Sequence, residues 1–237
     1  MSTSAERLRS PQQRAERAAR ILDVAADLLL RHGYRRVSID DVAEGAGIGK
    51  GTVYLHWKTR EQLFSAVFTR EVLRALEELR EALRTDPRAC LLHNFARAYF
   101  LAIVNRPLLR GFLLDDADLL GKLAHSADAA RDDRHATMAR EYFGLLAEHR
   151  LLCDDMPVGE IGYAYQATFE GFLRAEGAAP ADGQEQRADL LAWTIQRAFE
   201  SEPAIPVASL RDLAAATVTL LGGLIDVDRA ASGIPET

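Results

Sequence analysis

The sequence has too few cysteines and too short an apolar run for a disulfide-stabilised or membrane-spanning protein. Its 237 residues include only two cysteines, Cys90 and Cys153. A disulfide framework is therefore not expected, and a reducing compartment is indicated. The longest uncharged apolar run, residues 213–225, is shorter than the roughly 20 residues of a membrane-spanning helix. The N-terminus is charged from Glu6 onward and lacks the apolar core of a signal peptide. We expect a cytoplasmic protein with no membrane partner.

The sequence also lacks the local motifs of common enzyme and metal sites. It contains no Gly-x-Ser-x-Gly and no His-Glu-x-x-His motif. No two histidines are three or four residues apart. The six histidines are His32, His56, His93, His125, His135 and His149. We predict no catalytic residues, no metal and no cofactor.

Aromatic residues, proline and glycine are sparse as well. Aromatic residues make up 7% of the chain, which has 8 prolines and 16 glycines and is rich in leucine and alanine. Such a composition favours helices. No segment of useful length alternates apolar and polar residues with the two-residue period of a strand. The sequence predicts an all-α fold, long enough for one large domain or two modest ones.

Positive charge is in deficit overall but not at the N-terminus. The net charge is −6, yet residues 1–60 hold 11 lysines and arginines against 7 acidic residues, a charge of +4. Residues 61–237 therefore carry −10. A basic N-terminal part suits a polyanionic partner, and an acidic remainder favours one docking orientation over non-specific coating.

The strongest local signals lie within this basic part. Ser38 with Asp41 predicts the N-terminal cap of a short helix over residues 39–45. Gly47 supplies the positive φ of a tight turn. A second short helix is predicted over residues 50–57.

The second helix has one apolar side and several exposed donors. Val53 and Trp57 share one side, and a further cap at Thr59 with Gln62 limits the helix at its end. The donors are Lys50, Thr52, Tyr54, His56 and Lys58. Such side chains suit phosphates and base edges, so the pair of helices predicts a helix-turn-helix whose second helix enters a DNA major groove.

A phosphate-binding loop is the alternative interpretation of these glycines. It would need a glycine where Glu44 stands, a hydroxyl where Gly51 stands, and a strand before it. The preceding residues 39–44 have the pattern of a helix instead. We therefore do not expect a bound nucleotide.

The same stretch resembles a known family. The residues that carry the resemblance are Ser38-Ile39, Val42-Ala43, Ala46-Gly47-Ile48, Lys50-Gly51-Thr52-Val53-Tyr54, His56-Trp57 and Glu61-Gln62-Leu63. They resemble the DNA-binding signature of the TetR (tetracycline-repressor-like) family. The resemblance implies a dimeric, ligand-responsive, all-helical transcriptional regulator. Its helix-turn-helix domain would be residues 1–60, with an arm at 1–9, and its effector-binding and dimerisation domain residues 61–237.

Three residues depart from the family pattern. Gly49 stands where a serine often caps the second helix, and glycine is only a modestly poorer cap. Trp57 replaces a phenylalanine, which enlarges a core contact. Arg60 replaces a lysine that touches phosphate, which keeps the charge but not the geometry. None of the three argues against DNA binding.

Roles at the DNA follow from side-chain chemistry and from the resemblance. The predicted DNA-binding residues are Ser38, Gly49, Lys50, Gly51, Thr52, Tyr54, His56, Lys58 and Arg60. Lys50 and Thr52 are predicted to read base edges, with the backbone of Gly51 close to the DNA. His56 is a phosphate or base contact, and the remaining side chains are predicted to anchor phosphates.

Capping, proline and glycine signals predict the helices of the remaining chain. The expected ranges are 11–33, 59–83, 87–104, one from 107, one ending near 150, 157–176, 184–200 and 209–227. Residues 177–183 have the composition of a linker.

The resemblance also suggests a dimer interface and an effector pocket. The helices 157–176 and 184–200 would pair with those of a second subunit, and the first is rich in small residues that permit close approach. Burial of these small residues within one subunit is the alternative. Tyr99, Phe112 and Tyr142 are candidates for the effector pocket, and plain core packing is the alternative for each.

The sequence thus favours a homodimeric repressor that binds a palindromic operator in double-stranded DNA and is released by a small-molecule effector. Half-sites would lie about one helical turn apart, roughly 34 Å. An activator of the same family is an alternative. A small-molecule enzyme with an incidental helix-turn-helix and an architectural helical protein are more distant ones.

Overall fold

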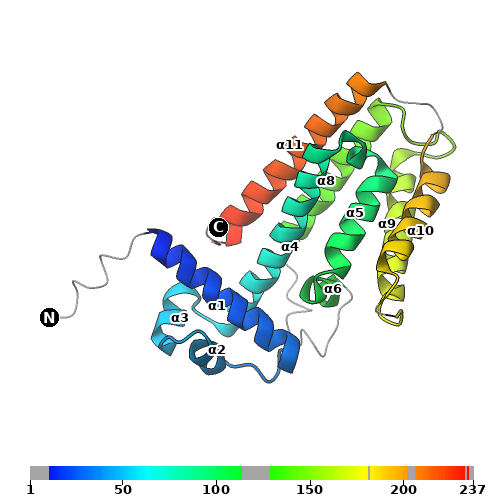
Figure 1. Cartoon of the computed structure of the whole chain (residues 1–237). Coiled ribbons are helices and arrows are strands. Elements are labelled where there is room, and N and C mark those ends of the chain that lie inside the picture. The colour runs from blue at the N-terminus through cyan, green and yellow to red at the C-terminus, as the bar shows by residue number, and fades with distance from the viewer. Residues whose placement is uncertain (1–10, 114–128, 181, 202–205, 233, 235–237) are drawn as a thin grey trace.

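The all-α prediction is confirmed. The computed structural model describes residues 11–113, 129–180, 182–201, 206–232 and 234. The described chain consists of helices joined by short connections and contains no strand (Figure 1). Its only β feature, among these residues, is an isolated antiparallel bridge between Leu152 and Glu200.

Three helices form a compact group at one end of the molecule, which we call the head (Figure 1). They are α1 (Pro11–His32), α2 (Ile39–Gly45) and α3 (Lys50–His56). Helix α1 buries an apolar stripe that includes Ile21 and Leu22. It ends as predicted at Gly33, whose φ is +70°.

Helix α4 (Arg60–Thr85) connects the head to the rest of the chain. Its first turns bury Leu63, Phe64 and Val67, and it packs against α1. Its later turns bury a second set, including Leu76 and Leu79, against α5 and α11. One hydrophobic core therefore continues from the head into the body, and the predicted domain boundary at residue 60 falls at the first residue of this shared helix.

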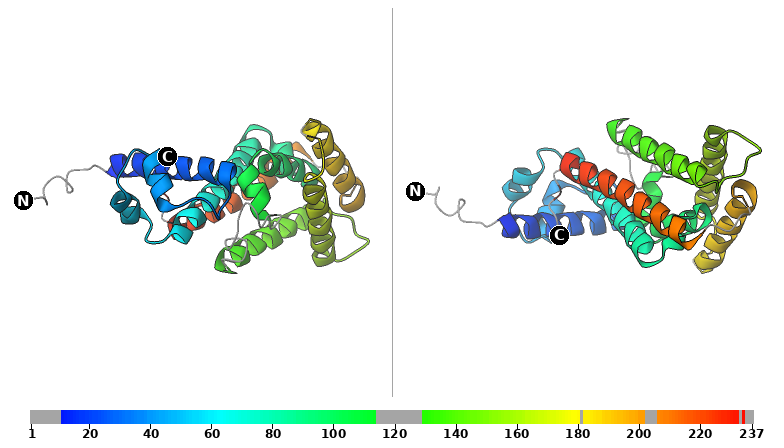
Figure 2. Two further views of the ribbon diagram at one scale, coloured as in Figure 1. Left: turned by 90° about the horizontal axis from the view of Figure 1, so that it is seen from below. Right: turned by 90° about the horizontal axis from the view of Figure 1, so that it is seen from above.

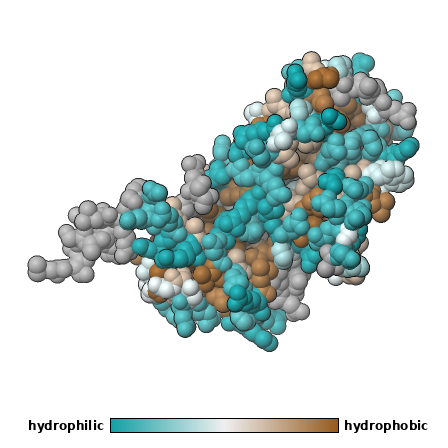
Figure 3. Space-filling model, in the orientation of Figure 1, coloured by the Kyte–Doolittle hydropathy of each residue, from teal (hydrophilic) through white to brown (hydrophobic). Residues whose placement is uncertain are grey.

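The remaining helices form the body around the far half of α4 (Figures 1 and 2). They are the 3-10 helix η1 (Pro87–Cys90), α5 (Leu92–Val104), α6 (Pro107–Leu113), α8 (Ala129–Glu148), α9 (Val158–Ala175), α10 (Gln184–Phe199) and α11 (Val207–Ser232). The closest pairings are α5 with α10 and α4 with α11. The face seen in Figure 1 is mostly hydrophilic, with hydrophobic residues showing over the head (Figure 3).

Two predicted helix boundaries were wrong. The helix expected over 87–104 is divided, because Asp86 caps a 3-10 turn and Leu91 has an extended backbone before α5 begins. The last helix begins at Val207 rather than Ser209, with the Leu210 amide donating to the Pro206 carbonyl at 3.0 Å. Ser209 therefore lies inside the first turn and does not cap the helix.

Helix α11 is the one described helix that is long and apolar enough, by length and composition alone, to cross a membrane. The mean hydropathy of its most apolar window is 1.3. However, it packs along α4, α8 and η1 and buries Leu213, Leu221 and Ile225. It also buries the charged Asp228. These contacts make α11 part of the core of the body.

Candidate DNA-binding interface and cavity

Helix α2 begins with the reciprocal cap that the sequence predicts. The Asp41 amide donates to Ser38 Oγ at 3.2 Å, and the Ser38 amide donates to Asp41 Oδ2 at 2.7 Å. Hydrogen bonds from the Ser38 hydroxyl and amide hold the pKa of the Asp41 carboxyl below its usual range. The cap fixes the start of a helix that is only seven residues long.

The turn between α2 and α3 depends on Gly47. Its φ is +65°, and a Cβ built at this position would meet no atom within 4 Å. The positive φ, rather than crowding, therefore requires glycine here. The Ile48 amide donates to the Ala43 carbonyl at 3.0 Å and closes the turn.

Helix α3 is fixed by its apolar side and leaves its other side free. Val53 is fully buried and Trp57 is 9% exposed. Lys50, Gly51 and Tyr54 lie on the exposed side. The helix lies on the side of the head turned away from α5, α9 and α10 (Figures 1 and 2). A short helix with exposed donors on the outside of a small module has the placement that major-groove reading needs.

Lys50 is paired with an acidic residue of α2. Its Nζ lies 2.7 Å from Asp40 Oδ2, and this hydrogen bond raises the pKa of Lys50. The two side chains are 48% and 66% exposed. Exposed ion pairs contribute little, roughly 0–1 kcal/mol, so exchange of Asp40 for a DNA acceptor costs little.

Lys58 and Thr59 lie where α3 ends and α4 begins. Lys58 Nζ donates to the Tyr54 carbonyl at 3.2 Å, next to the C-terminal end of α3. Thr59 Oγ1 accepts from the Gln62 amide at 3.1 Å, so the predicted cap of α4 is confirmed. The Gln62 side chain accepts from the Lys58 amide at 2.8 Å. The exposed ammonium of Lys58 is thus presented from a well-anchored backbone.

Arg60 is turned toward the protein. Its Nε donates to the Val37 carbonyl at 2.8 Å, and an Nη donates to the Tyr34 carbonyl. The guanidinium lies 4.0 Å from the centroid of the Tyr34 ring. These contacts tie the connection between α1 and α2 to α4. They occupy two of the five N–H donors of the guanidinium, so fewer remain for the predicted phosphate contact of Arg60.

His56 lies close to basic residues of α1. Burial lowers the pKa of His56, and the positive charges of Arg14 and Arg17 lower it further. Its ring centroid lies 5.3 Å from that of Trp57. The imidazole is therefore neutral at pH 7, and two guanidinium groups of α1 lie near the end of α3.

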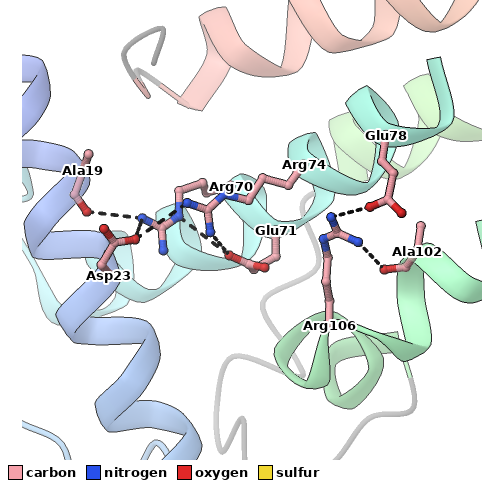
Figure 4. A network of polar contacts seen from close by, with 8 residues as sticks. All are labelled: Ala19, Asp23, Arg70, Glu71, Arg74, Glu78, Ala102 and Arg106. Atoms are coloured by element: carbon pink, nitrogen blue, oxygen red, sulfur yellow. Dashed lines mark hydrogen bonds and ion pairs between the residues drawn. The ribbon is translucent and has the colours of Figure 1, made fainter. Parts of the chain in front are cut away.

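A polar network joins the head to α4 (Figure 4). Arg70 of α4 is 6% exposed. Its Nη1 donates to Asp23 Oδ1 at 2.7 Å and to the Ala19 carbonyl at 3.2 Å, both on α1. Further along α4, Glu78 accepts from Arg106 at 2.6 Å, in the connection between α5 and α6. Polar contacts thus run from α1 along α4 to the start of α6.

The body contains a cavity of about 830 Å³ between α5, α8 and α9, with contributions from α4 and α6. An aromatic wall lines it, made of Tyr99, Phe143, Tyr165 and Phe169. The Tyr99 and Phe169 rings stack with centroids 5.6 Å apart, and the Tyr165 and Phe169 rings stack at 5.9 Å. The volume lies within the roughly 300–1,000 Å³ typical of small-molecule sites.

Comparison with known proteins identifies the head. Residues 21–67 match the family described as bacterial regulatory proteins, tetR family. This range covers the second half of α1, the whole of α2 and α3, and the start of α4. Over these residues the chain is therefore similar to the DNA-binding segment of the TetR family.

Individual relatives are similar to the chain in part of its sequence or in fold. The HTH-type transcriptional activator FasR of Mycolicibacterium smegmatis is 33% identical over 72 residues, which are 30% of this chain and 33% of that protein. NalD of Pseudomonas aeruginosa, a secondary repressor of the MexAB-OprM multidrug efflux pump, has the same fold with a TM-score of 0.59. It is 19% identical over 79% of this chain and 99% of that chain. CprB of Streptomyces coelicolor A3(2) gives a TM-score of 0.53 and 23% identity over 90% of this chain and 98% of that chain.

The TetR-family likeness in sequence is limited to the N-terminal part. Among the first curated relatives, the chain spans about a third to under half of their length. The structural neighbours named above are below 25% identity and therefore establish the fold of the body but not its ligand.

Only one of the three predicted effector residues is seen to line the cavity. Tyr99 lines the cavity. Tyr142 is not among the lining residues; its hydroxyl donates to the Cys90 carbonyl at 2.8 Å, and its ring stacks on Phe95 at 4.5 Å. Phe112 belongs to α6, but its side chain lies outside the described part of the structure. The sequence analysis did not select Tyr165, although its four-residue spacing from Phe169 on α9 could have indicated one shared aromatic wall.

Leu55 of α3 and Arg70 of α4 were also not predicted from the sequence to have a role. Leu55 is 54% exposed on α3, although it is apolar. Its position between the buried Val53 and Trp57 could have indicated that it faces outward. No local signal could have shown that Arg70 binds Asp23, because the two residues are 47 positions apart in sequence.

Proposed function

We propose that the chain is a homodimeric, ligand-responsive transcriptional regulator that binds an operator through α3. The observation that carries the proposal is the arrangement of α3. Its apolar side is fixed by Val53 and Trp57, while Lys50 and the backbone of Gly51 remain accessible. A helix held in this way can enter a major groove without rearrangement of the head.

The contacts with DNA divide into two kinds. Lys50 and Thr52, near the start of α3, are proposed to read base edges. Lys58, at the other end of α3, is proposed to bind a phosphate, together with Ser38 and Tyr54. The Ser38 hydroxyl donates its hydrogen to Asp41 Oδ2 in the cap of α2, so a phosphate contact from this hydroxyl would have to redirect that hydrogen. Arg60 is proposed to act mainly by fixing the Tyr34–Val37 connection.

An exposed apolar face supports the proposed homodimer. Leu190 and Trp193 of α10 are 53% and 58% exposed. A Cβ at Gly171 of α9, which does not line the cavity, would meet no atom within 4 Å, so this small residue is not used for close packing inside the subunit. We propose that α9 and α10 pack against the same helices of a second subunit.

The route from the cavity to the head supports regulation by a small molecule. Val72 of α4, Ile103 of α5 and Leu109 of α6 all line the cavity. Helix α6 also contacts α1, and Arg70 of α4 binds Asp23 of α1. A ligand that fits only one arrangement of α4 and α6 would change the separation of the two heads. Only one of the two states would then fit both half-sites.

We propose repression as the output, with activation as the alternative. NalD is described as a repressor and FasR as an activator, so family relatives include both. Transcription from the bound promoter with and without the protein separates the two. An enzymatic role is less well supported: a catalytic site would have to lie in the cavity, and turnover of a bound compound would reveal it.

Two lysine variants test the proposed mode of DNA binding. Lys58→Ala should weaken binding to all DNA sequences alike and lower the salt slope by about 0.9 per subunit, because it removes one phosphate contact. Lys50→Ala should change the base preference instead. Site selection and fluorescence anisotropy at several salt concentrations measure both effects. Identical base preferences for the wild type and Lys50→Ala would remove Lys50 from base recognition.

A further inference from the structure

The interior of the cavity offers a flat apolar wall and two hydroxyl groups. The rings of Tyr99, Tyr165 and Phe169 form a continuous stack along it. Neither the Tyr99 nor the Tyr165 hydroxyl has a hydrogen-bond partner within the described residues, although Tyr142, which lies outside the lining, does. Burial raises the pKa of both lining tyrosines, so they remain protonated donors at neutral pH. A ligand that reaches the wall would need acceptor atoms for them.

The charged residues around the same cavity are not balanced. Asp132 Oδ1 accepts from Arg131 at 3.0 Å, and Glu170 Oε1 accepts from the neutral side-chain amide of Gln166 at 3.0 Å. The lining residue His135 is held by the buried Asp228, at 2.7 Å. The lining therefore holds three arginines, Arg131, Arg140 and Arg174, against two carboxylates.

Two lining arginines have no carboxylate partner in the described structure. Arg140 of α8 donates only to the Thr137 hydroxyl, at 2.7 Å. The Arg174 side chain, near the end of α9, makes no hydrogen bond or ion pair with any described residue. Guanidinium groups pair well with carboxylate, sulfonate and phosphate oxygens, often through two parallel hydrogen bonds. Both therefore offer donors to an anion at the cavity.

We propose that the cavity binds an organic anion, with an apolar body against the aromatic wall and an oxyanion group paired with Arg140, Arg174 or both. Both arginines are exposed, so the anion would replace water at them, whereas a neutral apolar ligand would leave the two tyrosine hydroxyls without acceptors. A cationic ligand would meet an excess of positive charge, because the lining holds Arg131, Arg140 and Arg174 against Asp132 and Glu170. The inference rests on the proposed function only in taking this cavity as the effector site.

Two fluorescent probes of nearly the same body test the charge requirement. 8-Anilino-1-naphthalenesulfonate carries an anionic group, and N-phenyl-1-naphthylamine is its neutral counterpart. The full-length protein should bind the anionic probe about tenfold or more tightly than the neutral one, because only the anion accepts charge-assisted hydrogen bonds from the guanidinium groups. Equal affinities, or tighter binding of the neutral probe, would overturn the proposal.

Arginine variants locate the effect. Arg140→Gln combined with Arg174→Gln should weaken binding of the anionic probe about tenfold or more and leave the neutral probe within about twofold. Arg211→Gln is the matched control, because Arg211 is exposed on α11 and does not line the cavity. Loss of affinity in the control equal to that in the double variant, or no loss in the double variant, would contradict the assignment.

A blocking variant shows whether the probes occupy the cavity at all. A Cβ at Gly162, which lines the cavity, would meet no atom within 4 Å, so Gly162→Trp can project its ring into the space. Both probes should be lost from this variant, and retention of the anionic probe would overturn the proposed site. Operator binding by the unliganded wild type is measured in parallel. Operator binding without a preference for the anionic probe would overturn only the proposal that the ligand is an anion. Preference for the anionic probe without operator binding would overturn only the proposal that the protein is a transcriptional regulator.

Discussion

Gly51→Ala should separate the stability of the head from its affinity for DNA. Gly51 lies in the first turn of α3, and its Cβ would meet no atom within 4 Å. Its φ is not in the left-handed range, so alanine fits without strain. Alanine in a helix is more favourable than glycine by about 0.5–1 kcal/mol, which corresponds to an increase in Tm of about 1–4 °C for a chain of this size.

The same methyl group should weaken operator binding. On the proposed face it would stand between the α3 backbone and the DNA in both subunits. A loss of about 1 kcal/mol per subunit, at the low end for a base contact, gives about 2 kcal/mol per dimer and roughly a 30-fold higher Kd. Thermal unfolding and operator titration by fluorescence anisotropy measure the two effects.

The matched control for this experiment is Gly223→Ala. Gly223 is exposed on α11, within a helix, and its Cβ would also meet no atom within 4 Å. It should give a similar gain in stability with no change in operator affinity. If Gly51→Ala is more stable and binds operator as tightly as the wild type, α3 does not approach DNA in the proposed way.

Three further predictions concern the dimer, the core and pH. Trp193→Ala should weaken the dimer by about 2 kcal/mol per copy, which is roughly a thousandfold in Kd for two copies, as measured by sedimentation equilibrium. Val227→Ala, on α11 and 50% exposed, is the control and should leave the dimer unchanged. Equal effects of the two variants would contradict the interface proposed for α9 and α10. Phe64→Ala should lower the free energy of unfolding, measured in urea, by about 3–5 kcal/mol. The reason is that Phe64 is fully buried and its ring packs edge-on against that of Tyr34, with the centroids 5.5 Å apart. A loss below about 1 kcal/mol would contradict the role of Phe64 in the core. Because the pKa of His56 is lowered in the folded state, its contribution to stability is present above pH about 6.5 and is lost as the pH falls through that value toward the folded pKa. His56→Gln should therefore lose less stability than the wild type between pH 7 and 5.5, and equal losses in urea titrations would exclude His56 as the cause.

The head was predictable because its signals are local. Ser38 and Asp41 cap each other across three residues, and Thr59 caps α4 through the amide of Gln62 in the same way. Gly47 is required by the φ of a single turn. Each feature depends on atoms a few positions apart, so the order of residues specifies it directly.

Contacts between distant residues were not predictable in the same way. Arg60 has the charge of a phosphate contact, yet its donors reach the carbonyls of Tyr34 and Val37, 26 and 23 positions earlier. Tyr142 has the aromatic character of a pocket residue, but the packing of α8 directs its hydroxyl to the Cys90 carbonyl instead. Side-chain type identifies what a residue can do, and the tertiary fold decides which of these contacts it makes.

The proposed dimer interface, formed by α9 and α10 of each subunit, was predictable only in part. The small residues of α9 indicate close helix approach, but they do not say whether the partner lies in the same subunit. In the structure a Cβ at Gly171 would meet no atom within 4 Å, and Trp193 is 58% exposed, so neither is fully packed inside the subunit. A second subunit is the partner that would cover both helices at once.

The central claim is that the α3 helices of two subunits read one inverted repeat. The most direct measurement is to sequence the genomic fragments that the purified full-length protein retains, and then to footprint the enriched site with hydroxyl radicals. We predict a pseudo-palindromic sequence with two protected half-sites on one face of the DNA, about one helical turn or roughly 34 Å apart. Retained fragments with no shared sequence, or protection of a single half-site, would contradict the account.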